Sequence, residues 1–476
     1  MCALLSRTSD STATTESFAM NISQRIDRLP MTPFMRKVIV IAGIGLMFDA
    51  MDQGMVSGVI ASIGREWVLT SSQLGFLASA GVVGMFVGAL LAGFLSDRFG
   101  RRSIVLVTLL IFSAGSALCG LSTNYEMLLV FRFITGLGLG GELPVVTTMV
   151  SEFSPLRSRG RNVVLIESFW AWGWIIASLV AYLAIPAYGW RIAFFIGAVP
   201  ALFAALLRFM LPESPRYLDS VGKHDEADKI VTAMEKQADA IDSAEGAETA
   251  KSDAEATTVT ASTENSEAPA QMGPARAFAT LFSKRYRRAT IMIWILWFGV
   301  NLGYYGFVLW TPSLLVAQGY DLVKSFGFTL IMCIAQLPGY FTAAYLIEKL
   351  GRKPVLVIFL LGTAASAWMF GQAGSTTMIL VAGCLLYFFS LGTWGCIYSY
   401  TPEQYPTHIR GAGGGYASAF GRIGAFIAPM IVPVLYGSSG SQQGFQTVFL
   451  VLTGVFVIVA VAVCALGKET KGVNLD

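Results

Sequence analysis

The sequences SDRFGRR at 96–102 and IEKLGRK at 347–353 decide the fold, because they are two copies of one motif separated by 251 positions. The same shift aligns SEFSPLRSRGR at 151–161 with PEQYPTHIRGA at 402–412. Two different motifs related by one offset indicate an internal duplication. The chain is therefore predicted to consist of two related halves.

The composition indicates that these halves lie in a membrane. The chain has 476 residues, of which 54% are hydrophobic and 13% are charged, whereas soluble domains carry roughly 25% charged residues. Transmembrane helices need about 20 apolar residues each. We predict an all-α polytopic membrane protein with twelve transmembrane helices in two pseudo-symmetric six-helix bundles. The apolar segments run at 36–61, 73–95, 103–121, 125–150, 162–185, 191–211, 289–317, 325–347, 354–371, 377–400, 411–436 and 445–467.

The positive charges orient these helices. Of 33 Lys and Arg, only Arg65, Arg191 and Lys324 fall in the loops on one side, and Arg132 and Arg422 fall within spans. The remaining 28 lie on the other side, which the positive-inside rule identifies as the cytoplasm. We therefore expect a multi-pass protein of the cell inner membrane with both termini cytoplasmic.

The loop between the halves is unusual in composition. Residues 237–272 contain one lysine, many acids, and much Ala, Ser and Thr, and such a stretch buries too little apolar surface to order itself. We expect a largely disordered cytoplasmic loop, most simply a tether, with partner docking as the alternative. The expected divisions are a tail (1–35), the N-terminal bundle (36–211), the loop (212–288), the C-terminal bundle (289–467) and a tail (468–476).

Several chemistries lack the residues they need. The six cysteines have no metal-ligand spacing, and the two histidines are His224 and His408, so we expect no metal site. No GxxxxGK[ST] motif occurs, which excludes this route to nucleotide hydrolysis. No basic run with interleaved aromatics suggests a nucleic-acid partner. We therefore expect no cofactor and no enzymatic activity, and transport that runs on gradients.

Specific motifs resemble a known family. GFLSDRFGRR (93–102), RFITGLGLGGE (132–142) and PESPR (212–216) are similar to the major facilitator superfamily near its sugar-porter branch, and KETKG (468–472) resembles that branch's PETKG ending with Lys468 in place of proline. The resemblance covers 36–472 and implies the major facilitator fold. A closer resemblance is to bacterial niacin permeases, which are similar to the synaptic-vesicle-glycoprotein branch. It is carried by FDAMDQGM (48–55), GLGGELPV (138–145), ESFWAWGW (167–174), YYGFVLWTPS (304–313), AQLPGYF (335–341) and YTPEQYPTHIR (400–410).

The duplicated loop motifs place acids near arginines. In each half an acid precedes an arginine by four residues, and a second acid comes from a neighbouring loop. These charges are interpreted as a gate that latches the halves closed on the inside. This gating role is implied by the resemblance to the family and not by the spacing. The alternative is that they only fix orientation. The candidate gating residues are Asp97, Arg101, Glu152, Arg159, Glu348, Arg352, Glu403 and Arg410.

Charged residues within spans are expensive and are functional candidates. Asp49 and Asp52 share a helix face, and a rise of 1.5 Å per residue puts Asp52 and Arg132 at similar depths of roughly 24 and 27 Å. An acid beside an arginine stays ionised, which leaves Asp49 as the candidate proton carrier. Glu142, deeper toward the cytoplasm, joins this proton-coupling set. The alternative is a structural ion pair with one solvated acid.

Arg422 is the sharpest substrate-binding candidate. Spans 7 to 12 offer no obvious acid at its depth, and guanidinium binds a carboxylate through two parallel hydrogen bonds. The resemblance supports this, since organic-anion relatives share a basic residue here. The alternative is pairing with an acid of the other half.

Aromatic and amide side chains are candidates for the rest of the site. Glu167, Trp170 and Trp174 form one helical stripe, which is either a cavity wall or a packing surface. The other candidates are Asn301, Tyr304, Tyr305, Gln336, Trp394 and Tyr398.

Together these features favour a secondary active transporter that imports a small aromatic carboxylate, with nicotinate (niacin) as the best single candidate. Alternating access, proton coupling and a monomer in the lipid bilayer are expected. The alternatives are a carrier of another organic acid or a sugar, a drug exporter, and a membrane nutrient sensor that does not transport.

Overall fold

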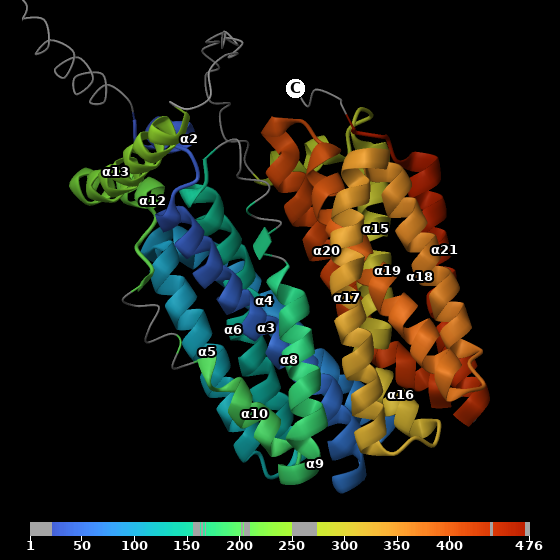
Figure 1. Cartoon of the computed structure of the whole chain (residues 1–476). Coiled ribbons are helices and arrows are strands. Elements are labelled where there is room, and N and C mark those ends of the chain that lie inside the picture. Colours follow the sequence, from blue (N-terminus) through green and yellow to red (C-terminus); the bar gives the residue numbers. More distant parts are fainter. Residues whose placement is uncertain are drawn as a thin grey trace, which may run out of the picture.

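The computed structural model describes residues 21–155, 162, 165–166, 168–200, 203, 210–249, 274–437 and 441–471. The described elements are all helices, in two bundles that lie side by side (Figure 1). The N-terminal bundle contains α3 (Pro33–Glu66), α4 (Ser71–Phe99), α5 (Arg101–Leu121), α6 (Tyr125–Phe153), α8 (Phe169–Leu183), α9 (Ile185–Tyr188) and α10 (Arg191–Gly197). The C-terminal bundle contains α15 (Arg287–Val308), α16 (Thr311–Ala317), α17 (Leu322–Leu350), α18 (Arg352–Gly371), α19 (Thr376–Glu403), α20 (Thr407–Gly437) and α21 (Ser441–Leu466).

The twelve-helix prediction is confirmed. Nine helices of the described part are long and apolar enough to cross a membrane. The other three positions belong to α3, which carries two buried aspartates, and to α8 and α10, whose described parts are short. Helix ends fall within a few residues of the expected spans because polar caps such as Thr32, Thr70 and Asn124 mark the starts.

The duplication is visible in two equivalent turns. Gly100 joins α4 to α5 with φ +92°, and Gly351 joins α17 to α18 with φ +101°, a backbone conformation that favours glycine. Glu213 accepts from the first two backbone N–H groups of α5 at 3.0 and 3.2 Å. Glu469 does the same for α18 at 3.0 and 2.9 Å. Both halves therefore begin their third helix with the same capped glycine turn.

The two bundles touch at one end and separate at the other. We call the end that carries α2 (Ile22–Arg28), α12 (Pro215–Ser220) and α13 (His224–Thr249) the inner end (Figure 1). In the outer half, Ser79 Oγ on α4 donates to Phe426 O on α20 at 3.0 Å, and Ser178 on α8 contacts Cys333 on α17 at 3.1 Å. In the inner half a cavity of about 590 Å³ lies between the bundles. The conformation is closed outside and open toward the inner end.

The disorder expected over 237–272 is wrong for 237–249, where α13 continues to Thr249. Ala227, Val231 and Met234 are spaced at helical intervals and pack into the core of the N-terminal bundle. Arg25 on α2 pairs with Glu235 at 2.7 Å. This apolar stripe precedes residue 237, so the composition of 237–272 taken alone did not reveal that a helix begun upstream continues into it. Residues 250–272 lie outside the described part, and α14 (Pro274–Leu281) resumes beside α20.

Candidate functional site

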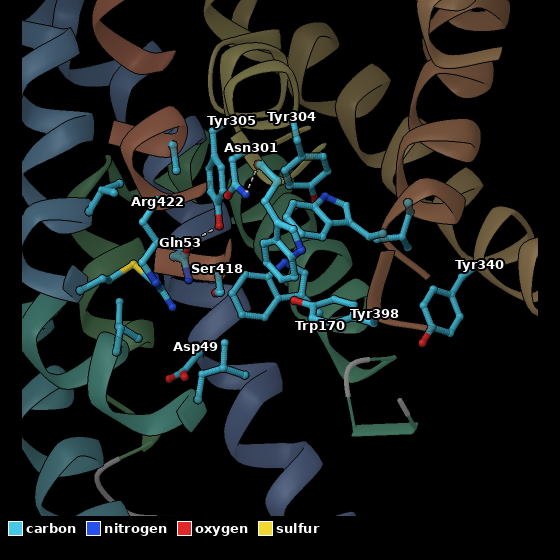
Figure 2. A pocket seen from close by; sticks show the side chains of 18 residues that line it. Asp49, Gln53, Trp170, Asn301, Tyr304, Tyr305, Tyr340, Tyr398, Ser418 and Arg422 are labelled. Carbon is cyan, nitrogen blue, oxygen red and sulfur yellow. Dashed lines mark hydrogen bonds between the residues drawn. The ribbon is translucent and has the colours of Figure 1, made fainter. Parts of the chain in front are cut away.

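A central cavity of about 80 Å³ lies between the bundles (Figure 2) and shares lining residues with the larger inner cavity. Trp297, Tyr398 and Arg422 belong to the walls of both. Helices of both bundles line the central cavity, so both contact any molecule bound there. Its lining is Asp49, Gln53, Val82, Met85, Leu139, Leu143, Trp170, Trp297, Asn301, Tyr304, Tyr305, Tyr340, Leu391, Trp394, Tyr398, Ser418, Arg422 and Ala425.

Arg422 supplies a positive charge to this cavity. It extends from α20 and is half-buried, and no carboxylate of the described residues lies within 4.0 Å of it. A partly buried guanidinium without an acid favours an anionic guest. Glu167, an acid of the other bundle that was predicted to bind substrate, lies outside the described residues.

Two amides lie in the wall, and their hydrogen bonds differ. The Tyr305 hydroxyl on α15 donates to Gln53 Oε1 on α3 at 3.3 Å, so this bond joins the two bundles. The Asn301 Nδ2 group donates to Trp297 O at 2.7 Å, within its own helix. Figure 2 shows both bonds as dashed lines at the cavity wall.

Aromatic rings form much of the remaining wall. Trp394 packs edge to face on Trp297 and Tyr304, with ring centroids 5.7 and 6.0 Å apart. It lies nearly parallel to Tyr398 at 5.9 Å. Rings that already pack against one another offer fixed flat surfaces, which suit a planar aromatic guest.

Most of the expected binding residues line the cavity, and two do not. Arg422, Trp170, Asn301, Tyr304, Tyr305, Trp394 and Tyr398 line it. Trp174, 1% exposed, packs behind Tyr304 with centroids 6.2 Å apart. Gln336 is fully buried in α17 and is not a lining residue. Both expectations fail because a shared helix face does not distinguish the wall from the layer behind it.

Four further polar or aromatic lining residues escaped the sequence prediction of the site. They are Gln53, Trp297, Tyr340 and Ser418. Helical spacing could have found three of them, because Gln53 follows Asp49, Trp297 precedes Asn301, and Ser418 precedes Arg422 by four residues.

A buried ion pair lies beside the cavity. Arg132 Nη1 and Asp52 Oδ2 are 2.8 Å apart, with side chains 3% and 0% exposed, and Ser116 also donates to Asp52 at 3.1 Å. The pairing predicted from equal depth is confirmed. Because Asp52 already pairs with Arg132 inside one bundle, Asp52 does not compensate the charge of Arg422.

Asp49 and Glu142 form a second buried acidic site. Asp49 on α3 and Glu142 on α6 are 1% and 0% exposed, and Asp49 Oδ1 and both carboxyl oxygens of Glu142 have no hydrogen-bond partner among the described residues. Glu142 lies against α3, since a Cβ on Gly45 would be 2.4 Å from its Oε1. Burial without a partner disfavours the ionised form of a carboxyl group, so such acids bind protons more readily than exposed ones. The arrangement can therefore hold and release protons next to the cavity.

The expected gate residues pair, but not between the bundles. Arg101 meets Glu152 at 3.0 Å in the N-terminal bundle, and Arg352 meets Glu403 at 3.2 Å in the C-terminal bundle. The expected latch across the halves is thus absent among the described residues in this conformation, because the bundles are apart at the inner end. Glu348 lies 3.5 Å from Arg352, Arg410 donates to Tyr405 O at 3.3 Å, and Arg159 and the side chain of Asp97 lie outside the described part.

A twelve-helix protein of two related bundles around a central cavity, open to one side, is a membrane transporter of the major facilitator type. The sequence profile of the family described as "Sugar (and other) transporter" matches residues 10–476, and the chain belongs to this family.

Similar proteins give finer resemblances. The niacin transporter NiaP of Acinetobacter baylyi is 44% identical over 96% of this chain and 99% of its own length. The putative niacin/nicotinamide transporter NiaP of Bacillus subtilis is 40% identical over 93% and 98%. Among solved structures, the xylose transporter XylE from E. coli in a partially occluded inward open conformation has a TM-score of 0.72 at 20% identity, covering 93% of this chain and all of that one. This last likeness supports the fold alone.

Proposed function

We propose that this protein imports nicotinate together with a proton, by alternating access, through the cell inner membrane. The observation that carries the proposal is that Arg422 has no acid partner among the described residues and lies in a cavity walled by aromatic rings. The 44% identity to a protein named a niacin transporter supports the choice among aromatic carboxylates. The inner end carries nearly all loop lysines and arginines, so it is the cytoplasmic end and holds both termini.

Arg422 binds the carboxylate of the substrate. A guanidinium offers two parallel N–H donors to a carboxylate, and such charge-assisted bonds are stronger than neutral ones. The rings of Trp297, Trp394 and Tyr398 enclose the pyridine ring. Nicotinamide lacks the negative charge and leaves Arg422 uncompensated, so the site prefers the acid.

Charge balance links the substrate to a proton. Among the described residues at the cavity, the charges of Asp52 and Arg132 cancel and Arg422 carries +1; in the proposed scheme the Asp49–Glu142 pair holds one proton and carries −1. The empty site is therefore neutral. One anion with one additional proton on the acidic pair restores neutrality, whereas either alone leaves a net charge, which is costly in a membrane.

The loop charges act as gate partners in this scheme. Arg101, Glu152, Arg352 and Glu403 hold each bundle's inner loops together while the inner end is open. When the inner end closes, these pairs exchange partners across the bundles. The functional unit is a monomer surrounded by lipid, and its cargo is the small carboxylate.

The test is counterflow of radiolabelled nicotinate in proteoliposomes of the purified protein. Unlabelled nicotinate inside the vesicles should drive accumulation of label, and benzoate should compete more strongly than nicotinamide or glucose. Strong block by glucose without an effect of unlabelled nicotinate overturns the proposal. Empty liposomes provide the background.

A further inference from the structure

The side-chain amide of Gln53 presents a hydrogen-bond donor to the cavity that has no acceptor among the described residues. Its side chain is 6% exposed and lines the central cavity. Its Oε1 accepts from the Tyr305 hydroxyl at 3.3 Å, whereas its Nε2 has no partner in the described part of the chain. A buried amide N–H₂ without an acceptor is costly, so this position suits a guest that brings an acceptor.

Neighbouring amides do not offer the same group. The Asn301 Nδ2 group already donates one of its two N–H bonds to Trp297 O at 2.7 Å, whereas Gln53 Nε2 has no described acceptor for either, and Gln336 lies outside the lining. Tyr304 has a buried hydroxyl without a described partner, but a hydroxyl both donates and accepts. The Gln53 oxygen is occupied by Tyr305, so its nitrogen is left to act as a donor only.

We propose that Gln53 binds the ring nitrogen of the substrate and makes the site specific for heteroaromatic over carbocyclic carboxylates. This inference rests on the proposed function. The neutral pyridine nitrogen has an in-plane lone pair and accepts one hydrogen bond from Gln53 Nε2, while Arg422 holds the carboxylate. Benzoate offers a C–H at that place and leaves the amide unsatisfied.

The two contacts come from different bundles. Gln53 belongs to α3 of the N-terminal bundle and Arg422 to α20 of the C-terminal bundle, and both reach the same cavity (Figure 2). Tyr305, which orients Gln53, also belongs to the C-terminal bundle. Recognition of the ring nitrogen therefore depends on the relative position of the bundles, and Tyr305 is a positioning residue.

The experiment measures the dissociation constants of nicotinate and benzoate for the purified full chain. For the wild type we expect nicotinate to bind roughly 10- to 100-fold more tightly, the range of one well-placed buried hydrogen bond. In Gln53→Leu this preference for nicotinate should disappear or reverse. The ring nitrogen of nicotinate then gives up its hydrogen bonds to water on binding and gains no donor from the protein. Benzoate affinity should stay within about threefold. Tyr305→Phe, which keeps the amide but removes its orienting donor, should give an intermediate ratio.

Gln336→Leu is the matched control, since Gln336 is an equally buried amide outside the cavity. It should keep the wild-type ratio. The inference is overturned if Gln53→Leu keeps the wild-type preference for nicotinate over benzoate. It is also overturned if Gln336→Leu loses this preference to the same extent, or if Tyr304→Phe loses it and Gln53→Leu does not. If Gln53→Leu does not fold, the wild-type ratio and Tyr305→Phe decide, and a wild-type ratio near one overturns it. Failure of the wild type to bind either acid counts instead against the proposed function.

Discussion

Asp52 on α3 and Arg132 on α6 face each other at 2.8 Å, both almost completely buried. Removing one partner leaves a buried charge alone, which destabilises a fold by about 3–5 kcal/mol. We expect Asp52→Asn to lower the free energy of unfolding by that amount, and thermal unfolding in detergent measures it. The double variant Asp52→Asn/Arg132→Gln should recover part of the loss. Glu66→Gln breaks the exposed pair with Arg191 and should cost less than about 1 kcal/mol.

Replacing Arg422 should abolish carboxylate binding. Hydrogen bonds to charged groups contribute about 1.5–3 kcal/mol each, so loss of two in Arg422→Gln should weaken nicotinate binding by roughly 100-fold or more. Arg422→Lys keeps the charge but loses the planar fork, and an intermediate loss is expected. Equilibrium binding to purified protein measures both, with membrane expression checked. Arg285→Gln, at an exposed site, is the control, and normal binding by Arg422→Gln would contradict the assigned role.

Asp49→Asn should separate exchange from proton-driven uptake. The variant removes the one carboxyl group of this pair that lines the cavity and that we expect to exchange its proton there, so a pH gradient should no longer drive nicotinate accumulation in proteoliposomes. Counterflow, which needs no net proton movement, should persist. Gly45→Ala tests the same site by geometry, because the added Cβ would meet Glu142 Oε1 at 2.4 Å. Gradient-driven accumulation by Asp49→Asn would show that another group carries the proton.

The equivalent glycine turns should tolerate no side chain. Gly351→Ala combines φ +101° with a contact 2.9 Å from the Glu469 carboxylate, and a strained backbone of this kind costs about 1–3 kcal/mol. Gly454→Ala is the matched control, because a Cβ there meets nothing within 4 Å and the helix gains about 0.5–1 kcal/mol. Melting temperatures of the two variants should move in opposite directions. A shift in the same direction would refute the argument.

Glu469 should make stability depend on acid pH. Burial raises the pKa of Glu469, but backbone N–H donors of Lys471, Arg352, Lys353 and Thr470 outweigh it and hold the pKa below the ordinary value. A lowered pKa gives stability that is present above the unfolded value, about 4.5, and is lost as pH falls through the folded value. The melting temperature of the wild type should exceed that of Glu469→Gln at pH 7, and the difference should shrink toward pH 4. A constant difference would exclude this linkage.

The sequence predicted the features that depend on one helix at a time. Hydropathy placed the spans, and depth along two helices paired Asp52 with Arg132. The offset between repeats placed Gly100 and Gly351 in equivalent positions. These quantities need only the rise of a helix and the period of a pattern.

The sequence could not predict features that depend on neighbours in three dimensions. Gln53 became a donor only because Tyr305, 252 positions away, occupies its oxygen. Trp174 shares a stripe with Trp170 yet lies behind the wall. The acids of the gate were predicted to meet arginines. The sequence does not specify which conformation the bundles adopt, and therefore not whether these pairs form within a bundle or between the two.

In the proposed proton-coupled cycle, the balance of charge around Arg422 limits what the protein can accumulate. A carrier that is neutral both empty and fully loaded moves no net charge, so membrane voltage does no work on its cycle. The proton gradient is then the sole source of energy, and each unit of pH difference sustains about a tenfold concentration ratio of the anion. A cell that relies on such a protein scavenges vitamin best in acidic surroundings, however strongly its membrane is polarised.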